Sequence, residues 1–204
     1  MVLTDTDIWK EIKKKRGHHF IITPTDLLED QIKTFTIDLR VDFRFVKLRF
    51  KKQEDASGIE NRSTIILDKV PSYDAVEKSH GDVVTLESGQ RFHLEAEGSI
   101  LAWTYEKIVI PPHLAARIEG KSTWARLGLT IHNTAPTIHP GFGYSREGKP
   151  VGKQVCLEVA NLNKDADIEI TPCSRECYLS QLILESVKSP PKVSYSQKGQ
   201  FVPT

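Results

Sequence analysis

The alternation of apolar and polar residues is the feature that most constrains the fold of this chain. After residue 35 the period becomes two, with apolar residues at Ile37, Leu39, Val41, Phe43 and Phe45. This is the pattern of one long, half-buried strand. Shorter runs predict further strands, separated by turns with Pro and Gly, at 64–67, 83–86, 92–95, 100–105, 108–110, 114–118, 130–132, 155–161, 168–170 and 178–185. Many short strands favour a mainly β domain, a distorted barrel or a jelly roll.

The remaining segments predict one short helix and one terminal arm. Residues 5–16 carry an apolar stripe at helical spacing and are expected to form a short N-terminal helix. With 204 residues and 39% hydrophobic content, the chain is long enough for one full core, and two domains would be cramped. We therefore expect a single domain over 1–204, with a surface loop or insertion at 51–63 and a polar arm at 190–204.

Charge and cysteine content narrow the class of protein. The formal net charge is +1, so no broad positive field favours nucleic acid or an acidic membrane, and anion binding has to be local. No apolar run approaches the roughly 20 residues that span a bilayer, and the N-terminus does not look like a signal peptide. The odd set Cys156, Cys173 and Cys177 provides no disulfide framework, which favours a reducing cytoplasm.

The segment GKSTWARLGL, from Gly120 to Leu129, concentrates the side chains of a ligand site. Gly120 ends an apolar run, and a short helical turn is expected after it. Ser122 or Thr123 would lie at the start of this turn, where unpaired backbone N–H groups attract anions. Ser122 and Arg126 are four positions apart and would share one face. Hydroxyl, guanidinium and backbone together suit a phosphate, so we expect a polyanionic small ligand.

A carboxylate in the apolar segment VCLEVAN is a second candidate. Glu158 lies between Leu157 and Val159 in an expected strand. Because neighbouring side chains of a strand point to opposite faces, Glu158 would face away from both. Such a carboxylate lies either on a solvated sheet face or in a site.

Taken together, three segments resemble one protein family. The order GKSTWARLGL, IHNTAPTIHPGF and CLEVAN is similar to G-R-S-S-x-A-R-L-G-L, H-x-T-A-x-x-I-D-P-G-[WF] and a strand ending in L-E in the dCTP deaminase family, a branch of the dUTPase-like superfamily. Weaker agreement extends over most of the chain. The resemblance implies a dUTPase-like β fold and a homotrimer with sites at subunit interfaces. It implies conversion of dCTP and water to dUTP and ammonia without a catalytic metal, Mg²⁺ bound with the triphosphate, and inhibition by dTTP.

The same resemblance assigns the chemistry to a few residues. Deamination needs water to attack the ring carbon that bears the amine, and one carboxyl group can shuttle the protons. Glu158 occupies the shuttle position of the family. Arg126 and Ser122 resemble the residues that hold the attacking water and the polar groups around it. Lys121 and Thr123 match phosphate-side positions, where lysine replaces the usual arginine and keeps the charge without the bidentate fork.

Further nucleotide contacts are implied by the resemblance alone. Ala135 belongs to the loop 132–135, which would pack over the base and orient it with backbone groups, while His132 itself would serve to shape the loop. Cys156 and Leu157 are expected beside the nucleotide. The arm supplies three candidates that would close over it: Tyr195, Lys198 and Gln200.

Two departures from the family pattern bear on the substrate. His139 replaces the aspartate of I-D-P-G, which holds the sugar 3′-hydroxyl and, in dUTP-hydrolysing relatives, activates the water that attacks the α-phosphate. Histidine supplies no fixed anionic acceptor, so we expect His139 to face the sugar without supporting dUTP hydrolysis. The glycine-rich, charged segment 143–152 is longer than in the family. It is expected to be either a lengthened hairpin beside the site or a surface insertion.

Two alternatives keep the same family. One is a bifunctional enzyme that deaminates dCTP and also hydrolyses dUTP. The other is a catalytically silent protein that binds a nucleotide and signals to a partner. Ser122, Arg126 and Glu158 together argue against silence, because a silent binder has no chemical need for the shuttle carboxylate.

A zinc-dependent deaminase is a third alternative, from another family. Such enzymes carry H-x-E and P-C-x-x-C motifs around the metal, which His93 with Glu95 and Cys173 with Cys177 echo. These cysteines are one residue too far apart, and the histidine lies in a β-patterned stretch. We therefore expect no protein-bound metal.

Overall fold

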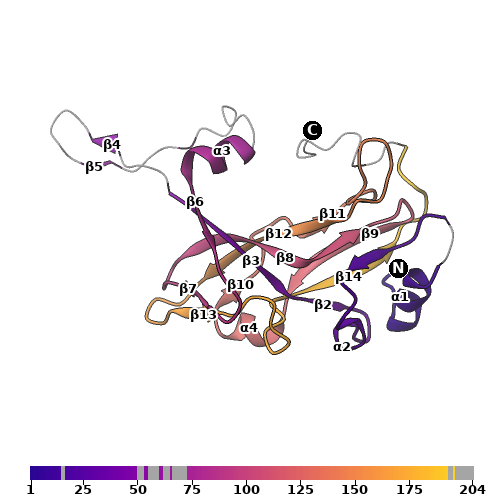
Figure 1. Cartoon of the computed structure of the whole chain (residues 1–204), viewed down its shortest axis with the longest axis horizontal. Coiled ribbons are helices and arrows are strands. Elements are labelled where there is room, and N and C mark those ends of the chain that lie inside the picture. The colour runs from indigo at the N-terminus through magenta and orange to yellow at the C-terminus, as the bar shows by residue number, and fades with distance from the viewer. Residues whose placement is uncertain are drawn as a thin grey trace.

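Two packed β-sheets form most of the molecule in the computed structural model (Figure 1). The structure describes residues 1–14, 17–49, 53–54, 60–61, 65, 73–192 and 195. The helices are α1 (Asp5–Ile12), α2 (Leu28–Gln31), α3 (Tyr73–His80) and α4 (Ser122–Arg126). The strands are β1 (Ile21–Thr23), β2 (Ile37–Leu39), β3 (Val41–Leu48), β4 (Gln53–Glu54), β5 (Glu60–Asn61), β6 (Gly81–Thr85), β7 (Phe92–Leu94), β8 (Ser99–Val109), β9 (Leu114–Gly120), β10 (Leu129–Thr130), β11 (Thr137–Ile138), β12 (Lys153–Asn161), β13 (Ile168–Ile170) and β14 (Ser180–Ser186). The expected mainly β architecture with a short N-terminal helix is confirmed.

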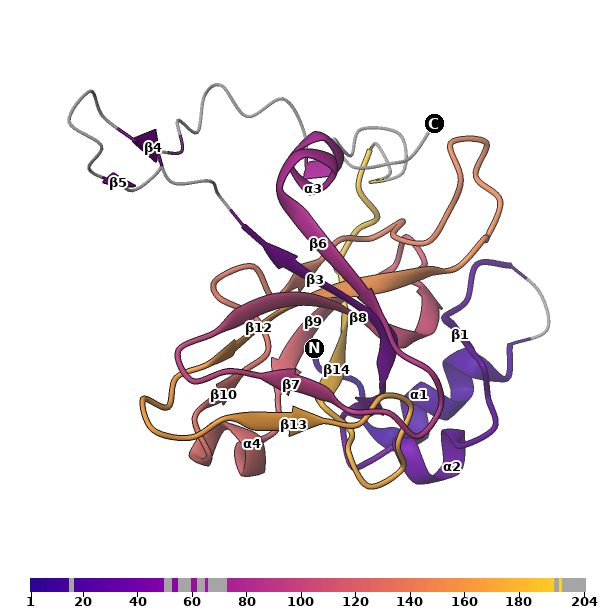
Figure 2. The same cartoon turned by 60° about the vertical axis from the view of Figure 1, so that its left-hand side comes forward.

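Strand pairing is antiparallel and brings together strands that are far apart in sequence. The larger sheet has the order β10-β12-β8-β3-β6, with β1 also paired to β8, and the smaller sheet has the order β11-β9-β14-β2. β7 and β13 form a separate ribbon at one end, which Figure 2 shows, and β4 pairs with β5. Over the described residues the strands do not close into one continuous barrel, so the fold is an open, distorted version of the expected barrel.

In β8 and β12 of the larger sheet, alternation decides which side chains face the core. Ile100, Ala102 and Ile108 of β8 point inward and are at most 4% exposed. Leu157 and Val159 of β12 point inward in the same way and are 0% exposed. Leu101, Trp103 and Glu158 alternate with these residues and face outward, because successive side chains of a strand alternate between its faces. This outward face of β8 and β12 is the surface on which the site is built.

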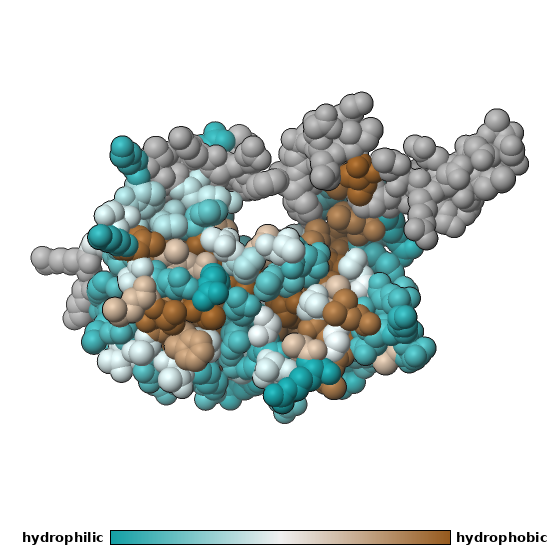
Figure 3. All heavy atoms as spheres, turned by 180° about the vertical axis from the view of Figure 1, so that it is seen from behind, coloured by the Kyte–Doolittle hydropathy of each residue, from teal (hydrophilic) through white to brown (hydrophobic). Residues whose placement is uncertain are grey.

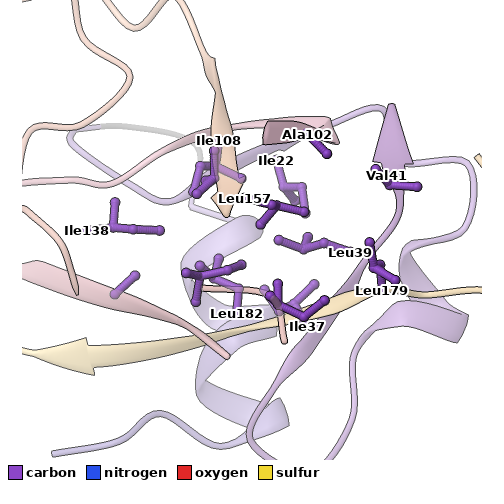
Figure 4. Packing of buried hydrophobic residues seen from close by; sticks show 14 of the residues in the cluster. Ile22, Ile37, Leu39, Val41, Ala102, Ile108, Ile138, Leu157, Leu179 and Leu182 are labelled. Carbon is purple, nitrogen blue, oxygen red and sulfur yellow. The ribbon is translucent and has the colours of Figure 1, made fainter. Parts of the chain in front are cut away.

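Apolar side chains from both sheets meet in one buried cluster. Ile37 and Leu182 come from the smaller sheet, and Ala102 and Leu157 come from the larger one (Figure 4). Ile8 of α1 joins the same cluster and is 0% exposed. Burying one such aliphatic side chain contributes roughly 1.5 to 3 kcal/mol, so the two sheets hold each other and fix the strands that carry the site.

The prediction of one long strand over 37–45 is wrong, because the strand is interrupted at Arg40. β2 ends before Arg40 and β3 begins after it, and the two strands belong to different sheets. The Arg40 N–H donates to Glu106 Oε2 at 2.9 Å, and Arg40 Nε donates to Glu106 Oε1 at 2.6 Å. A side-chain carboxylate thus accepts from the Arg40 N–H in place of a strand carbonyl, while the Arg40 carbonyl still accepts from the Tyr105 N–H of β8. Alternation alone could not reveal this break, since inward-facing residues continue on both sides of it.

A buried polar network secures this corner against β8. The side chains of Arg40 and Glu106 are 3% and 0% exposed. Burial opposes the charge on Arg40, but hydrogen bonds with Asp26 and Glu106 outweigh it and raise the guanidinium pKa. Gln31 of α2 donates to Glu106 Oε1 at 2.7 Å. The network therefore joins α2, the corner at Arg40 and β8 into one unit.

Several other boundaries differ from expectation. α1 ends at Ile12, before the expected end at residue 16, and the strands expected at 100–105 and 108–110 are one strand, β8. The elements α2, α3, β1 and β11 did not stand out as periodic segments in the sequence. Inside the expected loop 51–63, β4 pairs with β5. The strand expected at 64–67 falls outside the described residues except at one position.

Some apolar side chains also lie at the surface. Seen from behind, they gather in places bordered by hydrophilic residues (Figure 3). Leu127, Val151 and Leu162 are each more than half exposed in the single chain. In the part of the chain that the structure describes, no helix has the length and apolar content needed to cross a membrane.

Candidate active site

Glu158 lies on the outward face of β12, as the alternation predicted. Its neighbours Leu157 and Val159 point into the core. The Glu158 N–H donates to the carbonyl of Ile131 at 3.0 Å, and Glu158 Oε2 accepts from the Asn133 N–H at 2.9 Å. The carboxylate is therefore fixed between β12 and the loop that follows β10, and it stays partly exposed.

A cleft of about 850 Å³ opens beside this carboxylate. The outward face of β12, β8 and β3 contributes to its lining, and α3 contributes one residue. The polar and aromatic side chains that line it include Arg44, Glu77, Trp103, Asn133, Cys156 and Glu158. Small-molecule sites are typically concave, with a few convergent polar groups among apolar ones. The cleft around Glu158 is therefore the candidate active site.

Arg44, Trp103 and Glu77 belong to this cleft although no sequence motif points to them. The Arg44 guanidinium carbon lies 4.2 Å from the centroid of the Trp103 ring, and Arg44 Nη2 donates to Glu77 Oε1. Strand register is the signal that could have found one of them, since Trp103 pairs with Cys156 across β8 and β12. The three residues place a cation and a second carboxylate in the same cleft as Glu158.

Cys156 and Leu157, the predicted nucleotide contacts next to Glu158, face opposite sides of β12. The Leu157 side chain is 0% exposed, so a nucleotide could contact only its main chain. Cys156 is exposed in the single chain, yet desolvation by the surrounding cleft, together with the charge of Glu158, raises the pKa of its thiol to about 12. The thiol therefore stays protonated near neutral pH.

The side chains of Ser122, Thr123 and Arg126 lie on α4 and are all exposed. The short helical turn expected for this segment is confirmed. Among the described residues, those that line the cleft include none of these three. Within one chain, the structure thus places Ser122 and Arg126 on a surface separate from the Glu158 cleft.

The residues that flank α4 are held by their surroundings. The Lys121 ammonium donates to Asp38 Oδ2 and lies 5.6 Å from the centroid of the Tyr178 ring. Lys121, predicted to face phosphates, is thus paired with a carboxylate whose side chain is only 3% exposed. After the helix, Gly128 adopts a φ of 81°, the left-handed conformation common after helix C-termini. A Cβ there would lie 2.8 Å from Asn163 Nδ2.

The loop 132–135, predicted to orient a base, reaches the cleft through Asn133. His132 Nε2 lies 3.3 Å from Glu119 Oε2, an ion-pair geometry if the ring is protonated. Ala135 is exposed in the same loop.

His139 and the arm residue Tyr195 lie together. Their rings stack with centroids 5.4 Å apart and an angle of 17° between planes, and the Phe142 ring lies 6.2 Å from Tyr195. The Tyr195 N–H donates to the carbonyl of Pro140 at 3.3 Å. The structure therefore brings one predicted arm residue onto the residue predicted to face the sugar. Outside the described residues lie the other two, Lys198 and Gln200.

The segment 143–152 is a loop closed by an isolated bridge at Tyr144. Gly143 has a φ of 84°, and a Cβ there would lie 2.2 Å from the carbonyl oxygen of Ile108, so a side chain would clash with β8. Tyr144 is 6% exposed, its hydroxyl lies 3.1 Å from His18 Nδ1, and burial raises its pKa. No residue of this segment is among the described residues that line the cleft of the same chain.

The residues that echo a zinc-deaminase motif do not form a ligand set. His93 Nε2 lies 3.2 Å from Asp167 Oδ2, and desolvation raises the pKa of both Cys173 and Cys177. Over the described ranges, no group of three or more His, Cys, Asp or Glu side chains is arranged to hold a metal ion.

Comparison with known proteins bears on both the fold and the site. A family profile described as dCTP deaminase-like matches residues 2–187. A protein of Dictyoglomus turgidum named "dCTP deaminase, dUMP-forming" is 30% identical over 199 residues, which cover 98% of this chain and 87% of that protein. A protein of Halorubrum lacusprofundi named "dCTP deaminase" is 31% identical over 198 residues, which cover 96% of this chain and 82% of that protein.

A solved structure supports the same fold. The 2′-deoxycytidine 5′-triphosphate deaminase from Agrobacterium tumefaciens superposes with a TM-score of 0.57 over 91% of this chain. The sequences are 19% identical, and the match spans 48% of that longer chain. At this identity the likeness establishes the architecture, while the family assignment rests on the sequence matches.

Proposed function

This chain belongs to the dCTP deaminase-like family, and from that premise we propose that it hydrolyses the exocyclic amine of dCTP, forming dUTP and ammonia. The observation that carries the proposal is the position of Glu158, held by the Asn133 N–H in a cleft of small-molecule size. One carboxylate oxygen accepts this hydrogen bond. The other has no hydrogen-bond partner among the described residues, so it is available to a substrate.

The proposed chemistry uses this carboxylate as a proton shuttle. Water adds its oxygen to C4 of the cytosine ring while Glu158 takes one proton from it and passes that proton to N3. Glu158 then takes the proton of the new hydroxyl and passes it to the amine. The C4–N4 bond breaks, a carbonyl forms at C4 and ammonia leaves. A positioned general acid–base of this kind contributes roughly 10²- to 10⁴-fold in rate.

We propose that Ser122 and Arg126 reach this cleft from a neighbouring subunit of a homotrimer. The side chains of Ser122 and Arg126 are exposed in the single chain, and the described lining of the cleft does not include them. Closed rings of identical subunits are a common way to build a site from two copies of one chain. Arg126 and Ser122 would hold the attacking water beside the Glu158 of the next subunit.

The nucleotide is proposed to lie along α4 and the loops around it. Thr123 is proposed to offer its exposed hydroxyl to the phosphates. Lys121 is proposed to add a positive charge near them, although its ammonium also forms an ion pair with Asp38. The stacked rings of His139 and Tyr195 are proposed to border the sugar. Two further contacts, with the base, are proposed for the main chain of Ala135 and Leu157.

Mg²⁺ is proposed to arrive with the triphosphate and to neutralise its oxygens. Among the described residues no His, Cys, Asp and Glu group is arranged as a metal site, so the phosphate oxygens and water are the expected ligands. The proton transfers assigned to Glu158 do not involve this ion. Inhibition by dTTP remains a proposal from the family, and a cytoplasmic location is proposed because all three cysteines are free thiols.

A second candidate function is the formation of dUMP. Several relatives, including the Dictyoglomus turgidum protein, carry names that specify dUMP as product. Against this, His139 stands where a fixed carboxylate would be needed to activate water at the α-phosphate. We therefore propose dUTP as the product and treat dUMP as the alternative that the product assay decides.

The test follows ammonia and pyrophosphate separately, with dCTP and with dUTP, in Mg²⁺ and in excess chelator. We expect ammonia from dCTP, in chelator as well as in Mg²⁺, and no pyrophosphate from either nucleotide. Pyrophosphate would establish the bifunctional alternative. Nucleotide binding without either product would overturn the enzymatic proposal in favour of a silent binder.

A further inference from the structure

The residue before α4 is joined to β2 of the smaller sheet by a partly buried ion pair. The side chain of Asp38, on β2, is 3% exposed, and that of Lys121 is 26% exposed. A carboxylate this deeply buried needs a counter-charge, because an unpaired one would be strongly unfavourable. Lys121 supplies that charge from the residue that immediately precedes Ser122. Its ammonium is therefore committed to Asp38 in the absence of ligand.

Two further contacts hold the same short stretch. Gln181 Nε2, from β14, donates to the carbonyl of Gly120 at 3.0 Å. Trp124 Nε1 donates to the carbonyl of Tyr178 at 2.8 Å. Together with the ion pair, these contacts connect the beginning of α4 to β2, to β14 and to Tyr178, which lies just before β14.

α4 depends on this fastening, because it cannot stabilise itself. It spans Ser122–Arg126, and its N-cap residue makes no side-chain capping hydrogen bond. Helices this short are unstable on their own, since nucleation costs more than a few hydrogen bonds return. The direction in which Ser122 and Arg126 project is thus set by the residues that hold the turn.

We propose that Asp38 is a positioning residue for the deaminase site: by holding Lys121, it orients the turn that presents Ser122 and Arg126. Lys121 then acts chiefly as a strut between β2 and α4, and its contribution to phosphate binding is secondary. This proposal rests on the proposed function, in which Ser122 and Arg126 hold the attacking water. It differs from the family expectation that Lys121 serves the phosphates.

The test compares Asp38→Asn, Lys121→Gln and the double variant, with Lys121→Arg as the conservative variant. Lys33→Gln is the matched control, because Lys33 lines the same small pocket as Lys121 but donates to the carbonyl of Asp30. Three kinds of measurement are made on each purified full-length protein. They are steady-state kinetics with dCTP, which give kcat and KM, calorimetric binding of dCTP and of dCMP, and backbone hydrogen exchange over residues 120–128.

We expect Asp38→Asn and Lys121→Gln each to lower kcat by about tenfold or more, with KM changed by less than about threefold. Exchange over 120–128 should rise in both. The double variant should be no worse than the more affected single variant, because both remove one interaction. Lys121→Gln should weaken dCTP and dCMP binding by similar factors, Lys121→Arg should restore most of kcat, and Lys33→Gln should resemble the unmodified protein.

The strut would be overturned if Lys121→Gln weakened dCTP binding at least about tenfold more than dCMP binding while exchange over 120–128 stayed unchanged. It would also be overturned if the effects of the two single variants multiplied in the double variant. If Asp38→Asn does not fold, the comparison of Lys121→Gln with Lys121→Arg in kcat, nucleotide binding and hydrogen exchange tests the same proposal. An unmodified protein that releases no ammonia would contradict the proposed function, and hydrogen exchange would still decide whether the strut orders α4.

Discussion

The two halves of the candidate site are built in different ways. Glu158 stands on β12, between β10 and β8 of the larger sheet, with buried neighbours on both sides and a hydrogen bond from Asn133. Ser122 and Arg126 stand on a five-residue helix at the surface, with exposed side chains. The strand half is ordered by the core itself, whereas the helix half is held by the packing of Trp124 against that core and by a few polar contacts.

The difference indicates which half is complete in a single chain. The strand half already has a cleft, a carboxylate and a bound N–H donor. The helix half has an exposed hydroxyl and an exposed guanidinium, neither of which is among the described lining of the cleft in its own chain. If Glu158 meets Ser122 and Arg126 only when subunits assemble, turnover would depend on the oligomer. Substitutions in each half therefore separate their contributions to turnover and stability.

Glu158→Gln should remove turnover while nucleotide binding largely remains. The amide keeps the shape and the hydrogen bond from Asn133 but cannot accept and return protons, so we expect a loss of about 10²-fold or more in kcat. Ammonia release and calorimetric binding of dCTP measure the two effects. Glu77→Gln, in the same cleft, is the matched control and should retain far more activity. Near-normal turnover by Glu158→Gln would mean that another group carries the protons.

Glu106→Gln should destabilise the whole protein, because Glu106 belongs to the buried polar network that joins α2, the corner at Arg40 and β8. Glu106 is fully buried and accepts hydrogen bonds from Arg40 and Gln31. Removing its charge leaves Arg40 without its buried counter-ion, which costs about 3 kcal/mol or more. Denaturant unfolding measures this free energy. A change smaller than that of an exposed control such as Glu169→Gln would contradict the structural part assigned to this network.

Asp26→Asn should weaken the same corner less, and only above acid pH. The Arg40 guanidinium lowers the pKa of Asp26 below its ordinary value. The stabilisation is therefore present above the unfolded-state pKa and is lost as pH falls through the lowered one. Because the Asp26 side chain is 55% exposed, we expect an effect below about 1 kcal/mol. Unfolding at pH 7 and near pH 3 measures it, and a difference that grew on acidification would have the wrong sign.

Cys156→Ser should have the smallest effect on catalysis. The thiol lines the cleft, but its pKa of about 12 keeps it protonated near neutral pH, so it is neither base nor nucleophile. We expect kcat/KM for dCTP to change by less than about threefold. Alkylation of the unmodified protein should be slow at pH 8 and should accelerate as pH rises further. A tenfold loss of activity in the serine variant would assign the thiol a direct part.

Sequence patterns predicted those parts of the molecule that depend on local periodicity. The outward position of Glu158 and the inward positions of Leu157 and Val159 followed from alternation, and the turn at α4 followed from its glycine, hydroxyl and arginine spacing. The break at Arg40 did not, because it depends on a carboxylate 66 residues away in sequence. Local patterns carry no information about such a partner.

The cleft shows the same limit. Arg44 and Glu77 meet across 33 positions, and Trp103 reaches the cleft only because β8 lies beside β12. The pairing of Lys121 with Asp38 spans 83 positions, so its charge could be predicted but not its partner. A family resemblance suggests roles for matched residues, whereas the contacts that orient them are known only once the strands are placed.

Mixed oligomers of two inactive variants show whether each site combines residues from two subunits. Glu158→Gln and Arg126→Ala are co-expressed with different tags, and the hybrids are isolated through both tags and assayed for ammonia release from dCTP. If each site of a trimer takes Glu158 from one subunit and Arg126 from the next, every hybrid trimer keeps both residues intact in one of its three sites, and activity returns to about a third of that of the unmodified protein. If both residues act within one chain, no hybrid site is complete, and hybrids as inactive as their parents would contradict the account.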